Sequence, residues 1–229
     1  MKALLFGSIG VIAETSEMQR QCYNRALSEF RTGLYWNTAT YCHLIRTPGG
    51  LLRLERLGVA PETAQKVHLR KQELFLSELG GTSPRDGITQ LISECHEKNI
   101  ELGFITTTTR QTLDGVMAAL SDHIDFSQFS LITCADDVAS PKPASDIYHH
   151  ALSRLNRSAE DVFAIEDTEM NLAAAQNAGL KTGLFAGDYA TLSGPVPQMD
   201  DISLTACQAV LRSDDTARHG DRDALQSVA

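Results

Sequence analysis

From residue 101 onward the chain alternates short apolar runs with segments of helical periodicity, and this alternation limits the fold more than any other feature. Each apolar run has the length of a buried strand, and the segment after it repeats its apolar residues at helical spacing. Repeated strand–helix units predict a parallel sheet that is covered by helices on both faces and joined by right-handed crossovers. The expected strands cover residues 101–106, 130–133, 162–165 and 181–185, with helices around residues 113–120, 147–155 and 172–178.

The N-terminal stretch MKALLFGSIGVIAETSE predicts one further strand. An apolar run over residues 3–6 is followed by Gly7 and Gly10, which bracket a turn. This pattern is typical of a buried central strand that stops abruptly at a loop. In open α/β sheets ligands bind at the carboxyl ends of the strands, so we expect the functional site at this loop.

Composition excludes several classes of protein. With 229 residues, 42% of them hydrophobic, the chain can form one sizeable core and a small second unit. The apolar runs are too short for a transmembrane helix or a signal peptide, which predicts a cytoplasmic protein. A net charge of −9 without a basic stripe argues against nucleic-acid and membrane binding. The 5 cysteines are widely spaced, which predicts reduced thiols.

Residues 16–80 have a different character from the rest of the chain. Apolar positions at helical spacing predict helices from Met18 onward, around residues 51–57, and after Pro61. We therefore expect an α/β core domain over residues 1–15 and 81–212, a helical cap domain over residues 16–80, and a polar tail over residues 213–229.

Polar residues follow the expected strands in a fixed order along the chain. They belong to the stretches LLFGSIGVIAET, LGFITTTT, SPKPASDIY and VFAIEDTEMNLAAAQNAGL. In this order the stretches resemble the motifs of the haloacid dehalogenase (HAD) superfamily of phosphoryl-transfer enzymes. The resemblance covers roughly residues 2–186. It implies an α/β fold with a three-layer Rossmannoid core, a parallel sheet and an inserted small helical cap.

The cap stretches AETSEMQRQCYNRAL, GLYW and TPGGLLRL point to one branch of this superfamily. They resemble the cap of the CbbY-type sugar-bisphosphate phosphatases of bacteria. The resemblance implies that Glu17 and Arg53 contact a substrate from the cap. Leu51 departs from the pattern, because the branch carries a lysine after the paired Gly49 and Gly50.

The first motif lacks the residues that carry the chemistry. In the superfamily one aspartate attacks the phosphorus and a second, two residues on, protonates the leaving group; the corresponding residues here are Gly7 and Ile9. Neither can act as a nucleophile or exchange a proton. Loss of a nucleophile costs on the order of a million-fold in turnover. We therefore predict that no intact catalytic residue remains, which leaves open whether the chain is an enzyme.

The other motifs are retained. The resemblance implies that Thr106, Thr107 and Lys142 bind phosphate and that Glu166 and Asp167 ligate Mg²⁺. Taken singly, a threonine run is often only a turn, and a lysine before a proline is often a solvated loop residue. Because the four motifs occur together in this order, we favour vestigial phosphate binding by Thr106 and Lys142. Without a carboxylate at position 7, we expect Mg²⁺ to bind weakly or not at all and Lys142 to pair with an acidic residue. Alternatively, Asp167 caps the next helix.

The functional hypothesis is a pseudo-phosphatase that binds a phosphorylated small molecule. A first alternative is an active hydrolase of a sugar phosphate that uses substrate-held water or a displaced carboxylate such as Glu14 or Glu17. A second alternative is a regulatory or structural module that binds a protein partner, whose identity the sequence does not give.

Overall fold

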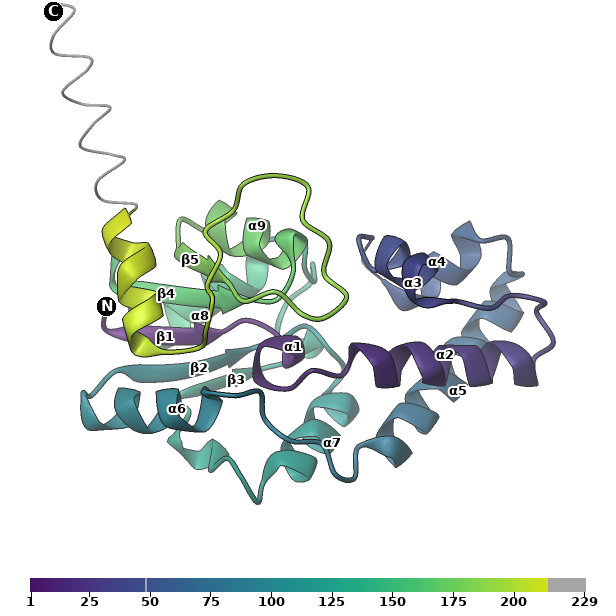
Figure 1. Cartoon of the computed structure of the whole chain (residues 1–229), viewed down its shortest axis with the longest axis horizontal. Coiled ribbons are helices and arrows are strands. Elements are labelled where there is room, and N and C mark those ends of the chain that lie inside the picture. Colours follow the sequence, from purple (N-terminus) through teal and green to yellow (C-terminus); the bar gives the residue numbers. More distant parts are fainter. Residues whose placement is uncertain (48, 214–229) are drawn as a thin grey trace, which may run out of the picture.

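The computed structural model describes residues 1–47 and 49–213, so the predicted tail lies outside it except for Ser213. A 5-stranded parallel sheet with strand order β3-β2-β1-β4-β5 forms the centre of the molecule (Figure 1). The N-terminal strand pairs with β2 on one side and β4 on the other, which confirms its central position. The strands are β1 (Ala3–Phe6), β2 (Glu101–Ile105), β3 (Leu131–Thr133), β4 (Val162–Glu166) and β5 (Lys181–Leu184).

Helices cover both faces of this sheet. Alternate residues of β1 point to opposite faces, so Leu4 and Phe6 belong to one apolar cluster and Ala3 and Leu5 to another. The first cluster contains α6 (Ile88–Glu97), α7 (Arg110–Leu120) and a helix over residues 204–213, and the second contains α8 (Asp146–Leu155) and α9 (Glu169–Asn177). This arrangement confirms the predicted three-layer α/β fold.

Four helices between β1 and β2 form a unit beside the sheet, on the right of Figure 1. They are α2 (Ser16–Glu29), α3 (Thr38–Leu44), α4 (Gly50–Arg56) and α5 (Pro61–Glu78). Tyr23, Trp36 and Tyr41 pack in the interior of this unit, with ring centroids 4.5 Å apart for the first two. The remaining short elements are α1 (Ile9–Ile12), η1 (Phe126–Gln128), η2 (Ala135–Asp137) and η3 (Ala159–Asp161).

The two crossings between sheet and helical unit lie side by side. The Arg85 N–H, where the chain returns, donates to the Ile12 carbonyl, where the chain leaves, at 2.8 Å. The Arg85 guanidinium also donates to the carbonyls of Gly10, Phe185 and Ala186 at 2.9, 3.2 and 2.8 Å. One side chain thus joins the loops after β1 and β5 to the returning chain.

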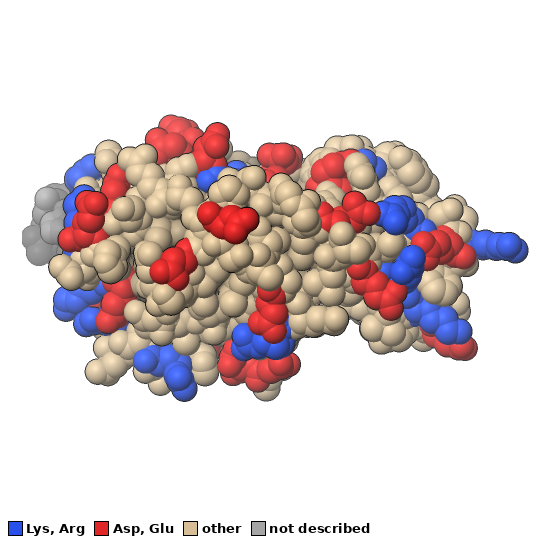
Figure 2. All heavy atoms as spheres, turned by 90° about the horizontal axis from the view of Figure 1, so that it is seen from below, with Lys and Arg blue, Asp and Glu red and all other residues tan. Residues whose placement is uncertain are grey.

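The surface carries charges of both signs. On the face in Figure 2, acidic and basic side chains are interspersed, and the basic ones form no continuous stripe. In the part of the chain that the structure describes, no helix is long and apolar enough to cross a membrane.

Candidate active site

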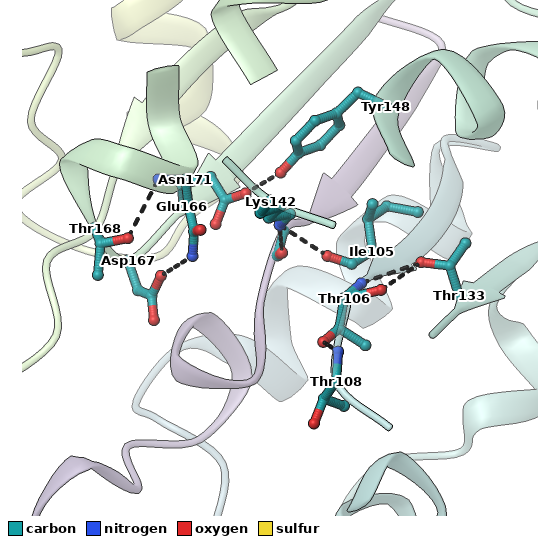
Figure 3. A network of polar contacts seen from close by, with 11 residues as sticks. Ile105, Thr106, Thr108, Thr133, Lys142, Tyr148, Glu166, Asp167, Thr168 and Asn171 are labelled. Atoms are coloured by element: carbon teal, nitrogen blue, oxygen red, sulfur yellow. Dashed lines mark hydrogen bonds and ion pairs between the residues drawn. The ribbon is translucent and has the colours of Figure 1, made fainter. Parts of the chain in front are cut away.

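The retained motifs meet at the carboxyl ends of β1, β2 and β4 (Figure 3). Lys142, which precedes α8, is buried, and its ammonium donates to the carbonyls of Gly7 and of Ile105, the latter at 3.1 Å. It also forms an ion pair with Glu166 Oε1 at 2.7 Å. These contacts use all the hydrogens of the ammonium. The predicted pairing of Lys142 with an acidic residue is confirmed, and Glu166 is the partner.

Glu166 is completely buried at the end of β4. The Tyr148 hydroxyl of α8 donates to the same Oε1 atom that binds Lys142, and the Lys142 ammonium lies 4.9 Å from the Tyr148 ring centroid. Within the described residues, Glu166 Oε2 has no hydrogen-bond partner. Burial raises the pKa of Glu166 to about 7, although the Lys142 ammonium acts in the opposite direction.

The space beside Gly7 is filled. A Cβ atom placed on Gly7 would overlap the Glu166 carboxyl group and would lie 2.6 Å from the Tyr148 hydroxyl. Ile9 is buried in the apolar cluster at the start of α1. At position 7, neighbouring side chains thus fill the volume beside the glycine, and at position 9 the side chain is apolar. These are the two positions at which the superfamily carries aspartates.

Thr106 follows β2 and is buried. Its hydroxyl accepts from the Thr108 N–H at 3.1 Å, and its backbone exchanges two hydrogen bonds of 3.1 Å with the Thr133 hydroxyl. Thr107 is half-buried beside it. These contacts describe an ordered turn at the strand end, and the phosphate-binding role of Thr106 and Thr107 stays a prediction.

Asp167 does not cap the following helix, contrary to the alternative interpretation. Thr168 is the N-cap residue of α9, and its hydroxyl accepts from the Asn171 N–H at 3.3 Å. The Asp167 side chain instead accepts from the Asn171 amide at 3.1 Å and lies against Gly10, where a Cβ atom would overlap Oδ2. The Thr168 backbone is extended, as is typical of an N-cap residue.

This arrangement offers Mg²⁺ fewer free carboxylate oxygens than the acidic pair contains. No group of three or more His, Cys, Asp or Glu side chains within residues 1–47 and 49–213 is placed to hold a metal ion. Glu166 Oε1 is already bound by the Lys142 ammonium and the Tyr148 hydroxyl. Of the acidic pair, only Asp167 has a carboxylate that these two groups do not bind. Mg²⁺ is usually held by one or two carboxylates together with water and substrate phosphate oxygens, so Asp167 is the residue of this pair that would ligate it.

The displaced carboxylates considered as nucleophiles are held by other donors. Glu14 accepts from the Ser16 N–H at 2.7 Å and from the Asp188 N–H at 2.8 Å. Glu17 forms two bonds of 2.6 and 2.7 Å with Arg20 and accepts from the Tyr189 hydroxyl. The Arg20 guanidinium, with a smaller contribution from Tyr189, lowers the pKa of Glu17 to about 2. Glu17 therefore lies where the helical unit meets the loop after β5.

Arg53 belongs to α4 of the helical unit. Its guanidinium donates to the Thr47 carbonyl at 2.9 Å, while its Nε is buried without a hydrogen-bond partner in the described structure. With His43 and Arg56 it lines a pocket of about 180 Å³. The substrate contacts implied for Glu17 and Arg53 remain predictions.

A pocket of about 280 Å³ lies between the helical unit and the core, beside the candidate site. Arg46 contributes a guanidinium that donates to the Ser193 hydroxyl at 2.8 Å, and Thr168 adjoins Asp167. The lining residues are Ile45, Arg46, Thr168, Glu169, Met170, Ala190, Thr191 and Ser193. Sequence reasoning missed Arg46 because its only signal is a charge in a short helix–turn segment.

Tyr148 was also missed, although the sequence contains a signal for it. It lies on the apolar stripe of α8 with Ile147 and Ala151, and a phenol on a buried stripe needs a hydrogen-bond partner. The partner, Glu166, could not be identified without the fold.

Comparison with known proteins defines the family. The family described as haloacid dehalogenase-like hydrolase matches residues 9–185. The chain belongs to the HAD superfamily. Within it, the chain is 33% identical to the protein CbbY of Rhodobacter capsulatus over 223 residues, covering 92% of this chain and 97% of the relative. It is 34% identical to a plasmid-encoded CbbY of Cupriavidus necator, covering 80% and 77%.

Solved structures place this HAD protein in the same CbbY-like branch. The crystal structure of CbbY from Rhodobacter sphaeroides in complex with phosphate matches it with a TM-score of 0.78 and 30% identity, covering 91% of this chain and 99% of that chain. A CbbY mutant from the same organism, in complex with xylulose-(1,5)bisphosphate, matches with the same TM-score and identity, covering 90% and 99%.

Proposed function

We propose that this HAD protein is a phosphatase homologue that does not turn over phosphate esters and that binds a phosphorylated sugar. The filled space beside Gly7 carries the first part of the proposal. Attack on phosphorus needs a carboxylate that can reach it, and position 7 offers none. Glu166 lies nearest, but its carboxyl group is fully buried and bound by Lys142 and Tyr148.

Binding is supported by the relatives and by the pocket beside the site. The structures of CbbY from Rhodobacter sphaeroides contain phosphate and xylulose-(1,5)bisphosphate. The present chain keeps the threonine and the lysine of the second and third motifs, and Arg46 adds an exposed guanidinium at the pocket. Such a guanidinium suits a phosphate group, because its planar fork can donate two parallel hydrogen bonds.

A module that binds a protein and no small molecule is the second candidate. The observation in its favour is that every hydrogen of the Lys142 ammonium already has an acceptor. A phosphate group can use Lys142 only if it displaces one of these acceptors, and that displacement weakens binding.

Calorimetry and thermal unfolding with xylulose 1,5-bisphosphate and with inorganic phosphate test the proposal. Each titration is run with EDTA and with Mg²⁺, and released phosphate is measured in parallel. We expect the bisphosphate to stabilise the protein in EDTA, by roughly 2.7 kcal/mol at a hundred times its Kd, without phosphate release. Arg46→Met should weaken binding, whereas Lys98→Met, at the exposed end of α6, serves as the matched control.

Two results would contradict the proposal. Steady release of phosphate by the native protein would show that a nucleophile remains. The absence of any stabilisation by either ligand would favour the protein-binding module instead.

A further inference from the structure

The missing side chain at position 7 leaves no void. Protein interiors are close-packed, so atoms removed from a buried site are normally replaced by a cavity, by water or by neighbouring groups. Beside Gly7 the replacement consists of protein atoms, namely the carboxyl group of Glu166 and the hydroxyl group of Tyr148. We infer that these two side chains have taken over the volume of the position-7 side chain and lock that position as glycine.

Burial and hydrogen bonding support the lock. Glu166 and Tyr148 each have an exposed fraction of 0%. The Tyr148 hydroxyl donates to Glu166 Oε1, and Lys142 binds the same atom at 2.7 Å. A side chain added at position 7 would have to move a buried carboxylate away from both of its partners. Removing a charged group from its hydrogen bonds in the interior is costly.

The charges balance without any other residue. The Lys142 ammonium is buried and needs a negative partner, which Glu166 supplies beside Gly7. The Tyr148 ring lies over the same ammonium. Lys142, Tyr148 and Glu166 together therefore fill the volume at this point and balance its charge, although Glu166 Oε2 has no hydrogen-bond partner among the described residues.

The backbone does not require glycine at this position. Gly7 is not among the glycines with positive φ, so its backbone conformation is open to other residues. The three heavy atoms nearest to a Cβ atom at position 7 belong to Glu166 and Tyr148. This makes the inference testable by changing those neighbours and leaving the backbone untouched.

The experiment measures the cost of Gly7→Ala in two backgrounds. One is the native chain, and the other is the triple variant Lys142→Met, Tyr148→Phe and Glu166→Ala, which removes the filling groups without leaving a charge unpaired. Urea unfolding gives the unfolding constant for each. We expect Gly7→Ala to raise that constant at least about tenfold more in the native chain than in the triple variant, as for residues in direct contact.

Gly10→Ala is the matched control. Its Cβ atom would also overlap a carboxylate, but that of Asp167. Gly10→Ala should therefore raise the unfolding constant by the same factor in the native chain and in the triple variant. That factor should fall only when Asp167→Ala is added.

The outcomes separate cleanly. A Gly7→Ala protein that fails to fold in the native chain but folds in the triple variant supports the lock, as does the expected difference in unfolding constants. An equal cost in both backgrounds, or no cost in the native chain, overturns it. The inference deepens the loss-of-turnover part of the proposed function, but the measurement needs no ligand and no activity. Its failure is therefore distinguishable from failure of that proposal.

Discussion

At the scale of single residues, Lys71 contrasts with Lys142. Both are buried, but among the residues that the structure describes Lys71 forms no ion pair with a carboxylate. Its ammonium lies between α2 and α5, where it donates to the Gln19 amide oxygen at 2.6 Å and faces the rings of Tyr23 and Phe75 at 5.1 and 4.9 Å. Amide oxygens and ring faces only partly replace the water that burial removes.

Burial accordingly lowers the pKa of Lys71 to about 8 from 10.5. The folded state then disfavours the proton, so the penalty on stability is complete below about pH 8 and disappears as the pH rises toward 10.5. The two values differ by the equivalent of roughly 3 kcal/mol. We expect the native chain to gain about this much stability relative to Lys71→Met between these pH values, as measured by urea unfolding.

Lys66→Met controls for the loss of a lysine from α5, since the Lys66 side chain is 55% exposed and pairs with Glu62. If the free energy of unfolding changes with pH in the same way for the native chain and for Lys71→Met, burial does not disfavour the Lys71 ammonium and the prediction fails.

At the scale of elements, Arg85 links the segment after β1, the segment after β5 and the chain that returns from the helical unit. Its guanidinium donates to carbonyls after β1 and after β5, and its guanidinium carbon lies 3.8 Å from the Phe185 ring centroid. A lysine keeps the charge but cannot reach several carbonyls with one planar fork.

We therefore expect Arg85→Lys to lower the free energy of unfolding by about 2 kcal/mol, because carbonyls lose charged donors. Cleavage by a protease at the two crossings should also become faster, since local opening there costs less. Limited proteolysis and urea unfolding measure the two effects. Arg154→Lys on the exposed side of α8 is the control, and equal behaviour of the two variants would refute the role of Arg85.

The elements also show which patterns predict structure. The strands were predictable because runs such as that of β1 are buried on both faces and so are continuously apolar. Two of the missed helices are short or lack an apolar stripe. α1 spans 4 residues, and α3 buries only Tyr41 although Asn37 caps it, accepting from the Thr40 N–H at 2.8 Å. The helix over residues 204–213 did carry a stripe, formed by Leu204, Cys207 and Val210.

At the scale of the whole molecule, the motifs predicted which strand ends meet but not how the space between them is filled. The pairing of Lys142 with an acidic residue was predictable, because without a carboxylate at position 7 the lysine is an alternative partner for the acidic pair. The position of Tyr148 depends on the volume that a glycine leaves in a three-dimensional site. A sequence pattern records which side chains are present and contains no measure of such a volume.

Under the proposed function, this difference changes which substitutions would produce turnover. From the sequence alone, Gly7→Asp with Ile9→Asp is enough to expect a trace of phosphatase activity, because both lost carboxylates return. In the structure the first of them meets Glu166 and Tyr148. Adding Tyr148→Phe removes one of the overlapping groups and one of the two donors that hold Glu166 in place. We expect Gly7→Asp with Ile9→Asp and Tyr148→Phe to hydrolyse p-nitrophenyl phosphate with Mg²⁺ at least about tenfold faster than Gly7→Asp with Ile9→Asp. The reason is that misplacing a reacting group by about 1 Å costs on the order of a hundredfold in rate.

Folding has to be measured beside activity, because Ile9 is buried and a carboxylate in its place is itself destabilising. Tyr148→Phe alone should have no activity, which controls for a contaminating phosphatase. If the two aspartate variants, with and without Tyr148→Phe, fold equally well and hydrolyse the ester at the same rate, the Tyr148 hydroxyl does not obstruct position 7. In that case, the proposed loss of turnover depends on the two absent aspartates alone, as the sequence first indicated.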